Sequence, residues 1–102
     1  MSDFRDVCAA SELAPGTCRE ARVGDRAVAL VNVEGTVHAL SNTCLHRGGP
    51  LGQGFVHGSL LICPWHAWAF DTATGISDVN ADLKLDRYEV KVENDQIWIR
   101  GG

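Results

Sequence analysis

Two short segments of the chain concentrate cysteine and histidine side chains. The first is Cys44-Leu45-His46 and the second is Cys63-Pro64-Trp65-His66, with residues 47–62 between them. Thiolates and imidazoles are the side chains that bind zinc, copper and iron in proteins. The types and spacing of these residues therefore predict a metal site whose ligands come from two separate segments.

Each of the two segments contributes one cysteine and one histidine, and this mixed grouping bears on which metal is bound. Zinc fingers usually pair cysteine with cysteine on one arm and histidine with histidine on the other. Mixed arms favour a two-iron cluster in which one iron takes both cysteines and the other takes both histidines. A tetrahedral structural zinc site, which would be colourless and redox-inert, stays as the alternative.

The elements that must position these ligands are short strands joined by turns. Apolar and β-branched residues alternate along several segments, and turn residues separate these segments. The expected strands, hairpins and turns are Arg26 to Val33, Glu34-Gly35, Thr36 to Leu40, Phe55 to Cys63 with a turn at His57-Gly58, Phe70 to Ile76 with a turn from Thr72 to Gly75, Asp86 to Glu93, Asn94-Asp95 and Gln96 to Arg100. No window has a sustained spacing of about 3.6 residues, so we expect little or no helix.

Short strands separated by glycine-rich turns are typical of all-β proteins. We therefore expect a small antiparallel sandwich or barrel that forms a single domain over residues 1–102. Two stretches do not alternate, Asn42 to Gly54 and Cys63 to Trp68, and both contain the ligand candidates. They predict a cluster-binding region made of two loops, at about residues 42–71.

The charge balance and the apolar stretches exclude several classes of protein. Lys and Arg number 9 against 13 Asp and Glu, which gives a formal net charge of −4. This balance argues against nucleic acid as a partner, because a phosphate backbone is bound by a basic face. The segment from Met1 to Val7 carries charges and no apolar core, and no apolar stretch is long enough to span a membrane. We therefore expect a cytoplasmic protein with no membrane partner.

The segment from Cys44 to Asp71, CLHRGGPLGQGFVHGSLLICPWHAWAFD, resembles the Rieske proteins, and specifically the small Rieske-type ferredoxins. The resemblance implies one Rieske-type 2Fe-2S cluster per chain, within a small all-β fold. By this resemblance, Cys44 and Cys63 hold the inner iron. His46 and His66 hold the outer iron near the surface.

The resemblance also implies a function for the chain. Rieske-type ferredoxins are one-electron carriers that receive electrons from a flavin-dependent ferredoxin reductase and pass them to a terminal, ring-hydroxylating oxygenase. We expect the chain to be the electron-transfer component of such a system and not the enzyme, since 102 residues leave no room for an oxygenase's catalytic domain. The alternative is the small Rieske-like subunit of an assimilatory nitrite reductase, although relatives of that kind often lack the ligands that are present here.

The chain departs from the quinol-oxidising Rieske proteins of respiratory complexes at four positions. Gly49 and Trp65 stand where those proteins carry cysteines joined in a disulfide, and Trp68 and Phe70 stand where they carry Ser and Tyr. Hydroxyl groups at the last two positions donate hydrogen bonds to cluster sulfur and stabilise the reduced form. As a class, Rieske centres span roughly −150 to +300 mV. We expect this chain to lie near the bottom of that range.

The other cysteines and histidines have structural interpretations. We expect Cys8 and Cys18 to be buried thiols, His38 to be a structural histidine in its strand, and His57 to be exposed in a hairpin turn. Four acidic residues follow the motif. They form either a solvated face or an acidic collar that steers the carrier to basic partners, and they are Asp78, Asp82, Asp86 and Glu89.

Overall fold

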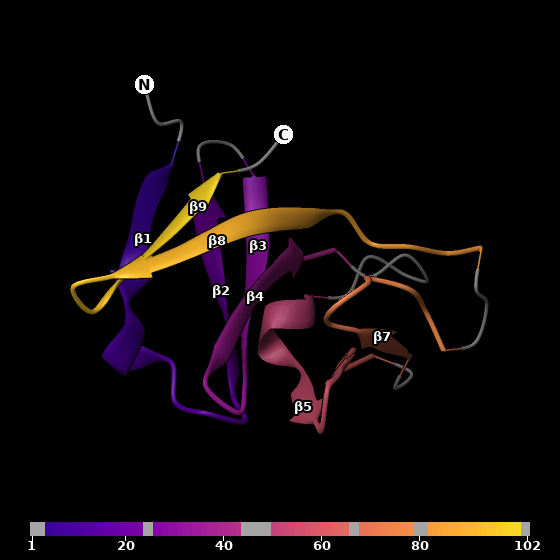
Figure 1. The fold of residues 1–102 in the computed structure, drawn as a ribbon. Helices are drawn as coiled ribbons and strands as arrows, with labels where there is room; N and C mark the ends of the chain where they lie inside the picture. The colour runs from indigo at the N-terminus through magenta and orange to yellow at the C-terminus, as the bar shows by residue number, and fades with distance from the viewer. Residues whose placement is uncertain (1–3, 24–25, 44–49, 66–67, 79–81, 101–102) are drawn as a thin grey trace.

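The computed structural model describes residues 4–23, 26–43, 50–65, 68–78 and 82–100. Over these ranges the chain forms nine strands and two short 3-10 helices (Figure 1). The elements are β1 (Arg5–Ala9), η1 (Ala10–Glu12), β2 (Cys18–Val23), β3 (Arg26–Val33), β4 (Thr36–Ser41), η2 (Leu51–Gln53), β5 (Phe55–His57), β6 (Leu60–Ile62), β7 (Ala69–Asp71), β8 (Arg87–Glu93) and β9 (Gln96–Arg100). The predicted all-β fold with little helix is therefore confirmed.

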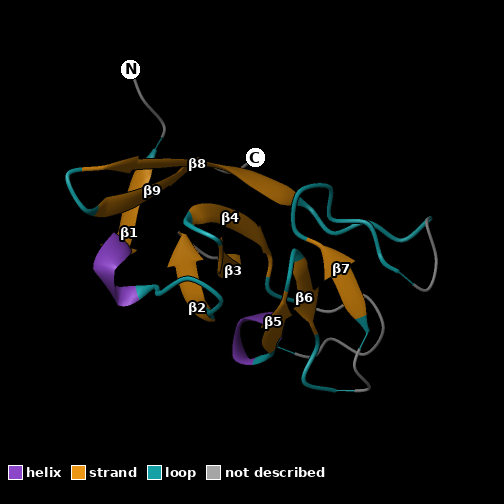
Figure 2. Ribbon diagram, turned by 60° about the horizontal axis from the view of Figure 1, so that its bottom comes forward, coloured by secondary structure: helices purple, strands orange, loops and turns teal. Residues whose placement is uncertain are grey.

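The strands form two antiparallel sheets. The larger has six strands in the order β1-β9-β8-β4-β3-β2, and its edge strands β1 and β2 lie near each other, so that the sheet curls into a nearly closed barrel. The smaller has three strands in the order β5-β6-β7. The helix η2 packs against β2 and β3. Figures 1 and 2 show the small sheet at the opposite side of the molecule from the β8–β9 turn.

The predicted hairpins are present, and their turns explain why. Glu34 and Gly35 join β3 to β4 with φ angles of 52° and 96°, and Asn94 and Asp95 join β8 to β9 with φ angles of 52° and 62°. Positive φ at both central residues is the geometry of a type I′ turn, whose twist matches that of the two strands. The β5–β6 hairpin turns at Gly58 in the same left-handed region, with φ 61°.

Strand β3 has the predicted bounds, but its apolar residues do not mark a single buried face. Val28, Ala29, Leu30 and Val31 are all 0% exposed. Val28 and Leu30 face the inside of the barrel, whereas Ala29 and Val31 face the small sheet. A strand covered on both faces reads as a continuous apolar run, which is why simple alternation describes it poorly.

Two apolar clusters hold the fold together, one on each face of β3 and β4. The barrel cluster consists of Leu13, Val28, Leu30, Ala39, Tyr88, Ile97 and Ile99. The joining cluster, between the barrel and the small sheet, consists of Ala29, Val31, Leu40, Leu51, Leu61, Cys63, Phe70 and Leu85. No helix among the described residues is long and apolar enough to cross a membrane.

The two type I′ turns give a reciprocal test of the hairpin geometry. Asn tolerates a left-handed backbone better than Glu does, and Asn94 and Glu34 have the same φ. We predict that Glu34→Asn raises the free energy of unfolding by about 0.5 to 1 kcal/mol, and that Asn94→Glu lowers it by a similar amount. Urea unfolding of both variants measures the two changes. Changes of the same sign in both variants would contradict this account of the turns.

Candidate iron–sulfur site

The first ligand segment, which contains the predicted ligands Cys44 and His46, lies between β4 and η2 in the chain. Thr43 forms an isolated antiparallel bridge with Pro50, and the backbone N–H of Leu51 donates to the carbonyl of Asn42 at 2.8 Å. The two ends of the segment therefore lie side by side. Cys44 and His46, and also Gly49, lie outside the described residues.

The second ligand segment begins at the end of β6. Cys63 is 2% exposed, and its backbone N–H donates to the carbonyl of Trp68 at 2.8 Å, which closes the segment into a loop. The backbone N–H of Trp65 points at the Cys63 sulfur, with 3.4 Å between nitrogen and sulfur. Such an N–H stabilises a thiolate more than a neutral thiol, since it places positive charge next to the sulfur. His66 lies outside the described residues.

The structure brings the two segments together through the joining cluster. Leu51, which follows the first segment, and Cys63, which starts the second, belong to this same cluster. Between them, Gly54 approaches β6 so closely that a Cβ atom there would lie 2.0 Å from the carbonyl oxygen of Ile62. The described residues contain no group of three or more Cys, His, Asp or Glu side chains, because three of the four predicted ligands are outside them.

The described part of the site fits an iron–sulfur cluster. A cysteine that binds iron does so as a thiolate, and the backbone N–H of Trp65 at the Cys63 sulfur is a donor that favours the thiolate. Phe70 is 0% exposed in β7, and Trp68 is half-buried against the joining cluster. Aromatic rings without a hydroxyl therefore occupy both positions that were compared above with Ser and Tyr. Trp65 is 49% exposed, which places its indole outside the core.

The two cysteines before the motif were expected to be buried, and the structure shows both only partly buried. Cys8 lies on β1 and Cys18 on β2, both half-buried, and neither forms a disulfide within the described ranges. The Cys18 thiol donates to the carbonyl of Gly54 at 3.5 Å. Burial raises the pKa of both thiols, so both stay neutral near pH 7. His57 is exposed, as predicted, but it lies in β5 and pairs with Leu60, so the turn is at Gly58-Ser59 and not at His57-Gly58.

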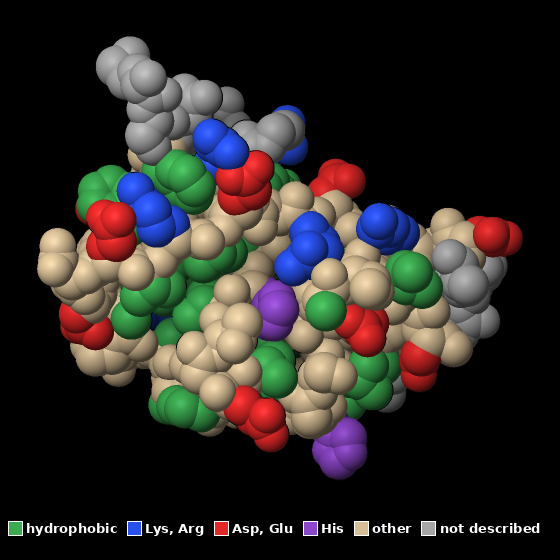
Figure 3. All heavy atoms as spheres, viewed as in Figure 1, with side chains coloured by type: hydrophobic (Ala, Val, Ile, Leu, Met, Phe, Trp, Pro, Cys, Tyr) green, Lys and Arg blue, Asp and Glu red, His purple; other side chains and the backbone are tan. Residues whose placement is uncertain are grey.

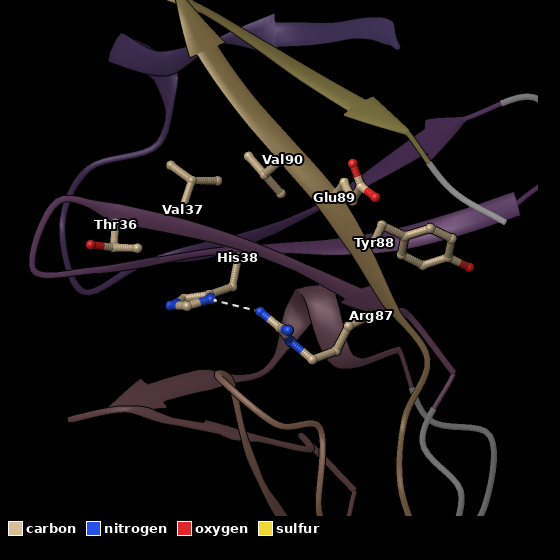
Figure 4. A pocket seen from close by; sticks show the side chains of 7 residues that line it. All are labelled: Thr36, Val37, His38, Arg87, Tyr88, Glu89 and Val90. Atoms are coloured by element: carbon tan, nitrogen blue, oxygen red, sulfur yellow. Dashed lines mark hydrogen bonds between the residues drawn. The ribbon is translucent and has the colours of Figure 1, made fainter. Parts of the chain in front are cut away.

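His38 is a structural histidine that contacts an arginine from the next strand. The Arg87 guanidinium donates from Nη2 to Nδ1 of His38 at 3.4 Å and from Nε to the carbonyl of Thr72 at 3.1 Å. Arginine has no acceptor, so the His38 proton must be on Nε2. The two side chains lie in a groove between β4 and β8 (Figure 4), which is lined by Thr36, Val37, His38, Arg87, Tyr88, Glu89 and Val90.

The acidic residues after the motif have separate roles. Asp78 accepts the backbone N–H of Ala69 at 3.2 Å, and Glu89 pairs with Arg100 on β9. Asp82 and Asp86 are exposed. On the face in Figure 3, acidic and basic side chains are interspersed along most of the surface. Asp78 and Glu89 therefore contact groups within the chain, and the acidic collar stays a prediction.

Sequence analysis missed the polar residues that surround the first ligand segment. Asn42 is 6% exposed and bonds to Glu20 on β2 and to the backbone of η2, and Gln53 bonds to the same Glu20 carboxylate. Asn42 marked only a boundary of the predicted loop region. The available sequence signal was an asparagine two residues before a predicted ligand, since its burial is seen only in the structure.

Comparison with known proteins identifies relatives along nearly the whole chain. Residues 3–89 match the Rieske [2Fe-2S] domain. Ferredoxin CarAc of Metapseudomonas resinovorans is 34% identical over 97 residues, which cover 93% of this chain and 91% of that protein. Apoptosis-inducing factor 3 of Homo sapiens is 35% identical over 95 residues. This chain covers only 16% of that longer protein.

Two solved structures are similar in sequence and in fold. The ferredoxin of carbazole 1,9a-dioxygenase from Nocardioides aromaticivorans is 29% identical, with a TM-score of 0.90 and coverage of 99% of this chain and 100% of that one. A chain from a complex of reduced oxygenase and oxidised ferredoxin in carbazole 1,9a-dioxygenase is 32% identical. Its TM-score is 0.87, with coverage of 99% and 95%.

The environment of His38 predicts a pH dependence of stability. Burial lowers the pKa of His38 below 6.5, the Arg87 guanidinium lowers it further, and the Asp71 carboxylate opposes them. The unfolded chain therefore binds this proton more readily than the folded chain does. Stability from this group is present above about pH 6.5 and is lost as the pH falls toward the folded-state pKa.

We predict that His38→Gln makes the protein less sensitive to acid. The loss of unfolding free energy between about pH 7.5 and pH 5.5 should be smaller in this variant than in the unchanged protein. Urea unfolding at the two pH values measures it, with His57→Gln as the exposed control. An equal loss in His38→Gln and the unchanged protein would show that the His38–Arg87 contact has no such effect.

Proposed function

Because the chain belongs to the Rieske [2Fe-2S] domain family, we propose that it is a one-electron carrier between a flavin-dependent ferredoxin reductase and a terminal, ring-hydroxylating oxygenase. The observation that carries this proposal is the match with ferredoxin CarAc over more than nine-tenths of both chains. The similar chain from an oxygenase–ferredoxin complex supports an oxygenase as the receiving partner. In this function the chain itself makes and breaks no substrate bonds.

The residues that hold the cluster are part of the proposal. Rieske domains contain one 2Fe-2S cluster per chain, which supplies reversible uptake of one electron. Cys44 and Cys63 hold the inner iron, and His46 and His66 hold the outer iron. The burial of Cys63 and the Trp65 N–H at its sulfur support this assignment. Two neutral imidazoles in place of two thiolates lower the negative charge of the site, and this makes reduction easier.

The surface beside the second ligand segment suits brief contact with a protein partner. Trp65 precedes His66 directly and is 49% exposed, and Phe55 on β5 is 63% exposed. Exposed aromatic rings are enriched at protein interfaces because they bury a large apolar area with few rotatable bonds. An electron that leaves through His66 would pass at this surface.

The location and the alternative function follow from the same observations. We place the carrier in the cytoplasm, in keeping with its match to ferredoxin CarAc over most of both chains. The alternative, a small subunit of an assimilatory nitrite reductase, has weaker support. The relatives that match over most of their own length include ferredoxin components of carbazole and naphthalene dioxygenase systems.

The chain offers a matched test of the ligands, because it has four cysteines and four histidines, half of them outside the proposed ligand set. We predict that each single alanine variant of a ligand abolishes cluster binding, since the remaining groups cannot complete the iron coordination. Iron and acid-labile sulfide per chain and the EPR signal of the reduced protein measure it. The ligand variants are Cys44→Ala, His46→Ala, Cys63→Ala and His66→Ala.

The matched controls should keep a full complement of iron and sulfide. They are Cys8→Ala, Cys18→Ala, His38→Ala and His57→Ala. Loss of the cluster in a control, or its retention in a ligand variant, would overturn the ligand assignment. A colourless protein that contains zinc and no sulfide would favour the structural zinc site instead.

The reduction potential depends on groups that donate hydrogen bonds to sulfur. Phe70 has no hydroxyl and belongs to the same apolar cluster as Cys63. A hydrogen bond to a charged group contributes about 1.5 to 3 kcal/mol, which for one electron corresponds to a potential difference on the order of 100 mV. The absence of a hydroxyl group at Trp68 and Phe70 supports a low-potential cluster.

We predict that Phe70→Tyr raises the midpoint potential by on the order of 50 to 100 mV, because the added hydroxyl favours the reduced, more negative cluster. An EPR-monitored redox titration measures this change. Phe55→Tyr adds the same hydroxyl at an exposed position and should leave the potential unchanged. If the protein without substitutions has a midpoint potential well above zero, the low-potential assignment is wrong.

A further inference from the structure

Asn42 is a buried polar residue that forms hydrogen bonds both to η2 and to the strands β2 and β3. It follows β4, two residues before Cys44, and is 6% exposed. Its backbone N–H donates to the carbonyl of Ala27 at 3.2 Å, and its own carbonyl accepts the N–H of Leu51 at 2.8 Å. The side-chain oxygen accepts the N–H of Gly52 at 2.6 Å. The main chain and the side chain of one residue therefore both bind η2.

The amide nitrogen of Asn42 completes the network by donating to Oε1 of Glu20 at 3.0 Å. The same carboxylate oxygen accepts from Nε2 of Gln53 at 3.1 Å. Glu20 lies on β2, an edge strand of the barrel, and Gln53 is the last residue of η2. Asn42 thus connects the end of β4 to η2, and through Glu20 it connects both of them to β2.

The contact between η2 and this network leaves no free space. A Cβ atom at Gly52 would lie 2.6 Å from Cγ of Glu20 and 2.7 Å from Oδ1 of Asn42. The isolated bridge between Thr43 and Pro50 lies beside this contact. Both ends of residues 44–49 are consequently held by groups that Asn42 binds or adjoins.

The same short helix reaches the second ligand segment. Leu51 on η2 packs in the joining cluster with Cys63. Gly54, the residue directly after η2, lies against the carbonyl of Ile62, the residue before Cys63. A shift of η2 would therefore change the position of the first segment relative to Cys63. Asn42 sets the position of η2.

We propose that Asn42 is a positioning residue that fixes the separation of the two ligand segments by hydrogen-bonding η2 to the end of β4. This inference rests on the ligand set proposed above. Neither Asn42 nor Glu20 binds iron in this role. They hold the backbone in the geometry that lets two distant segments share one cluster, as hydrogen-bonded residues outside a metal site orient its ligands.

The test reverses the hydrogen bond between the two side chains. In Asn42→Asp, a carboxylate oxygen replaces the amide nitrogen that donates to Glu20, so that two carboxylates face each other. Adding Glu20→Gln restores a donor, since the new amide can donate to Asp at position 42. Glu20→Ala is a second single variant at an exposed strand position, which removes the acceptor without placing a charge in the core.

The control is Asn32→Asp. Asn32 is also buried, at 7% exposed, and it bonds in the same way through both side-chain atoms, to the carbonyl of Leu13 and the N–H of Gly35. It lies on β3 at the hairpin end of the barrel and has no bond to η2. Asn32→Asp therefore shows the effect of lower stability alone, without a displacement of the ligand segments.

The measurements are the rate at which the purified holoprotein loses iron to a chelator and the EPR g-values of the reduced protein. We expect Asn42→Asp to lose iron about tenfold faster with shifted g-values, and Glu20→Ala to show a smaller acceleration. The double variant should return close to the unchanged protein. Asn32→Asp should keep the unchanged g-values and iron-loss rate.

Three results would overturn the positioning role. They are an unchanged rate and spectrum in Asn42→Asp, an equally fast loss in Asn32→Asp, and no recovery in the double variant. If the unchanged protein binds no 2Fe-2S cluster, the proposed function and this inference fail together. If it binds the cluster through the four ligands but ignores the change at Asn42, only this inference fails.

Discussion

The small sheet is attached to the barrel through one apolar cluster, and the sulfur of Cys63 lies inside it. Ala29 and Val31 on β3 form the barrel side of this contact, and Leu61 and Phe70 form the other side. Burial of these side chains stabilises the attachment, while the same burial removes water from one side of the proposed cluster. The attachment of the two sheets and the protection of a ligand therefore depend on the same packing. A change that loosens this cluster would affect both.

Burial alone would disfavour an ionised cysteine, and the local backbone compensates for it. A thiolate surrounded by apolar side chains is destabilised unless hydrogen-bond donors or positive charges face it. At Cys63 the Trp65 N–H supplies such a donor, and iron would supply the positive charge. The absence of hydroxyl donors at Trp68 and Phe70 then affects the reduction potential more than it affects binding. Retention of the cluster and its potential are thus controlled by different groups.

Polar contacts between distant residues complete the frame around the site. Glu20 and Asn42 join β2 to the segment that contains η2. His38 and Arg87 join β4 to β8. The Arg87 bond to the carbonyl of Thr72 extends this second contact to the residue that follows β7. Such directional bonds define relative positions that apolar packing alone does not fix. A carrier that changes charge by one electron benefits from a fixed frame, because little reorganisation then accompanies the transfer.

The amino-acid sequence by itself determined the features that depend on neighbours along the chain. The turn residues Glu34-Gly35 and Asn94-Asp95 specify two hairpins, and the spacing of Cys and His specifies the kind of site, because turn geometry and ligand type are local properties. That β3 is covered on both faces is seen only in the folded structure, since a continuous apolar run does not indicate which face of a strand is buried. The folded structure also shows that Asn42 meets Glu20 and that Arg87 meets His38. These pairs form between residues that are far apart in the chain, and their contact depends on strand order and register, which no local pattern records.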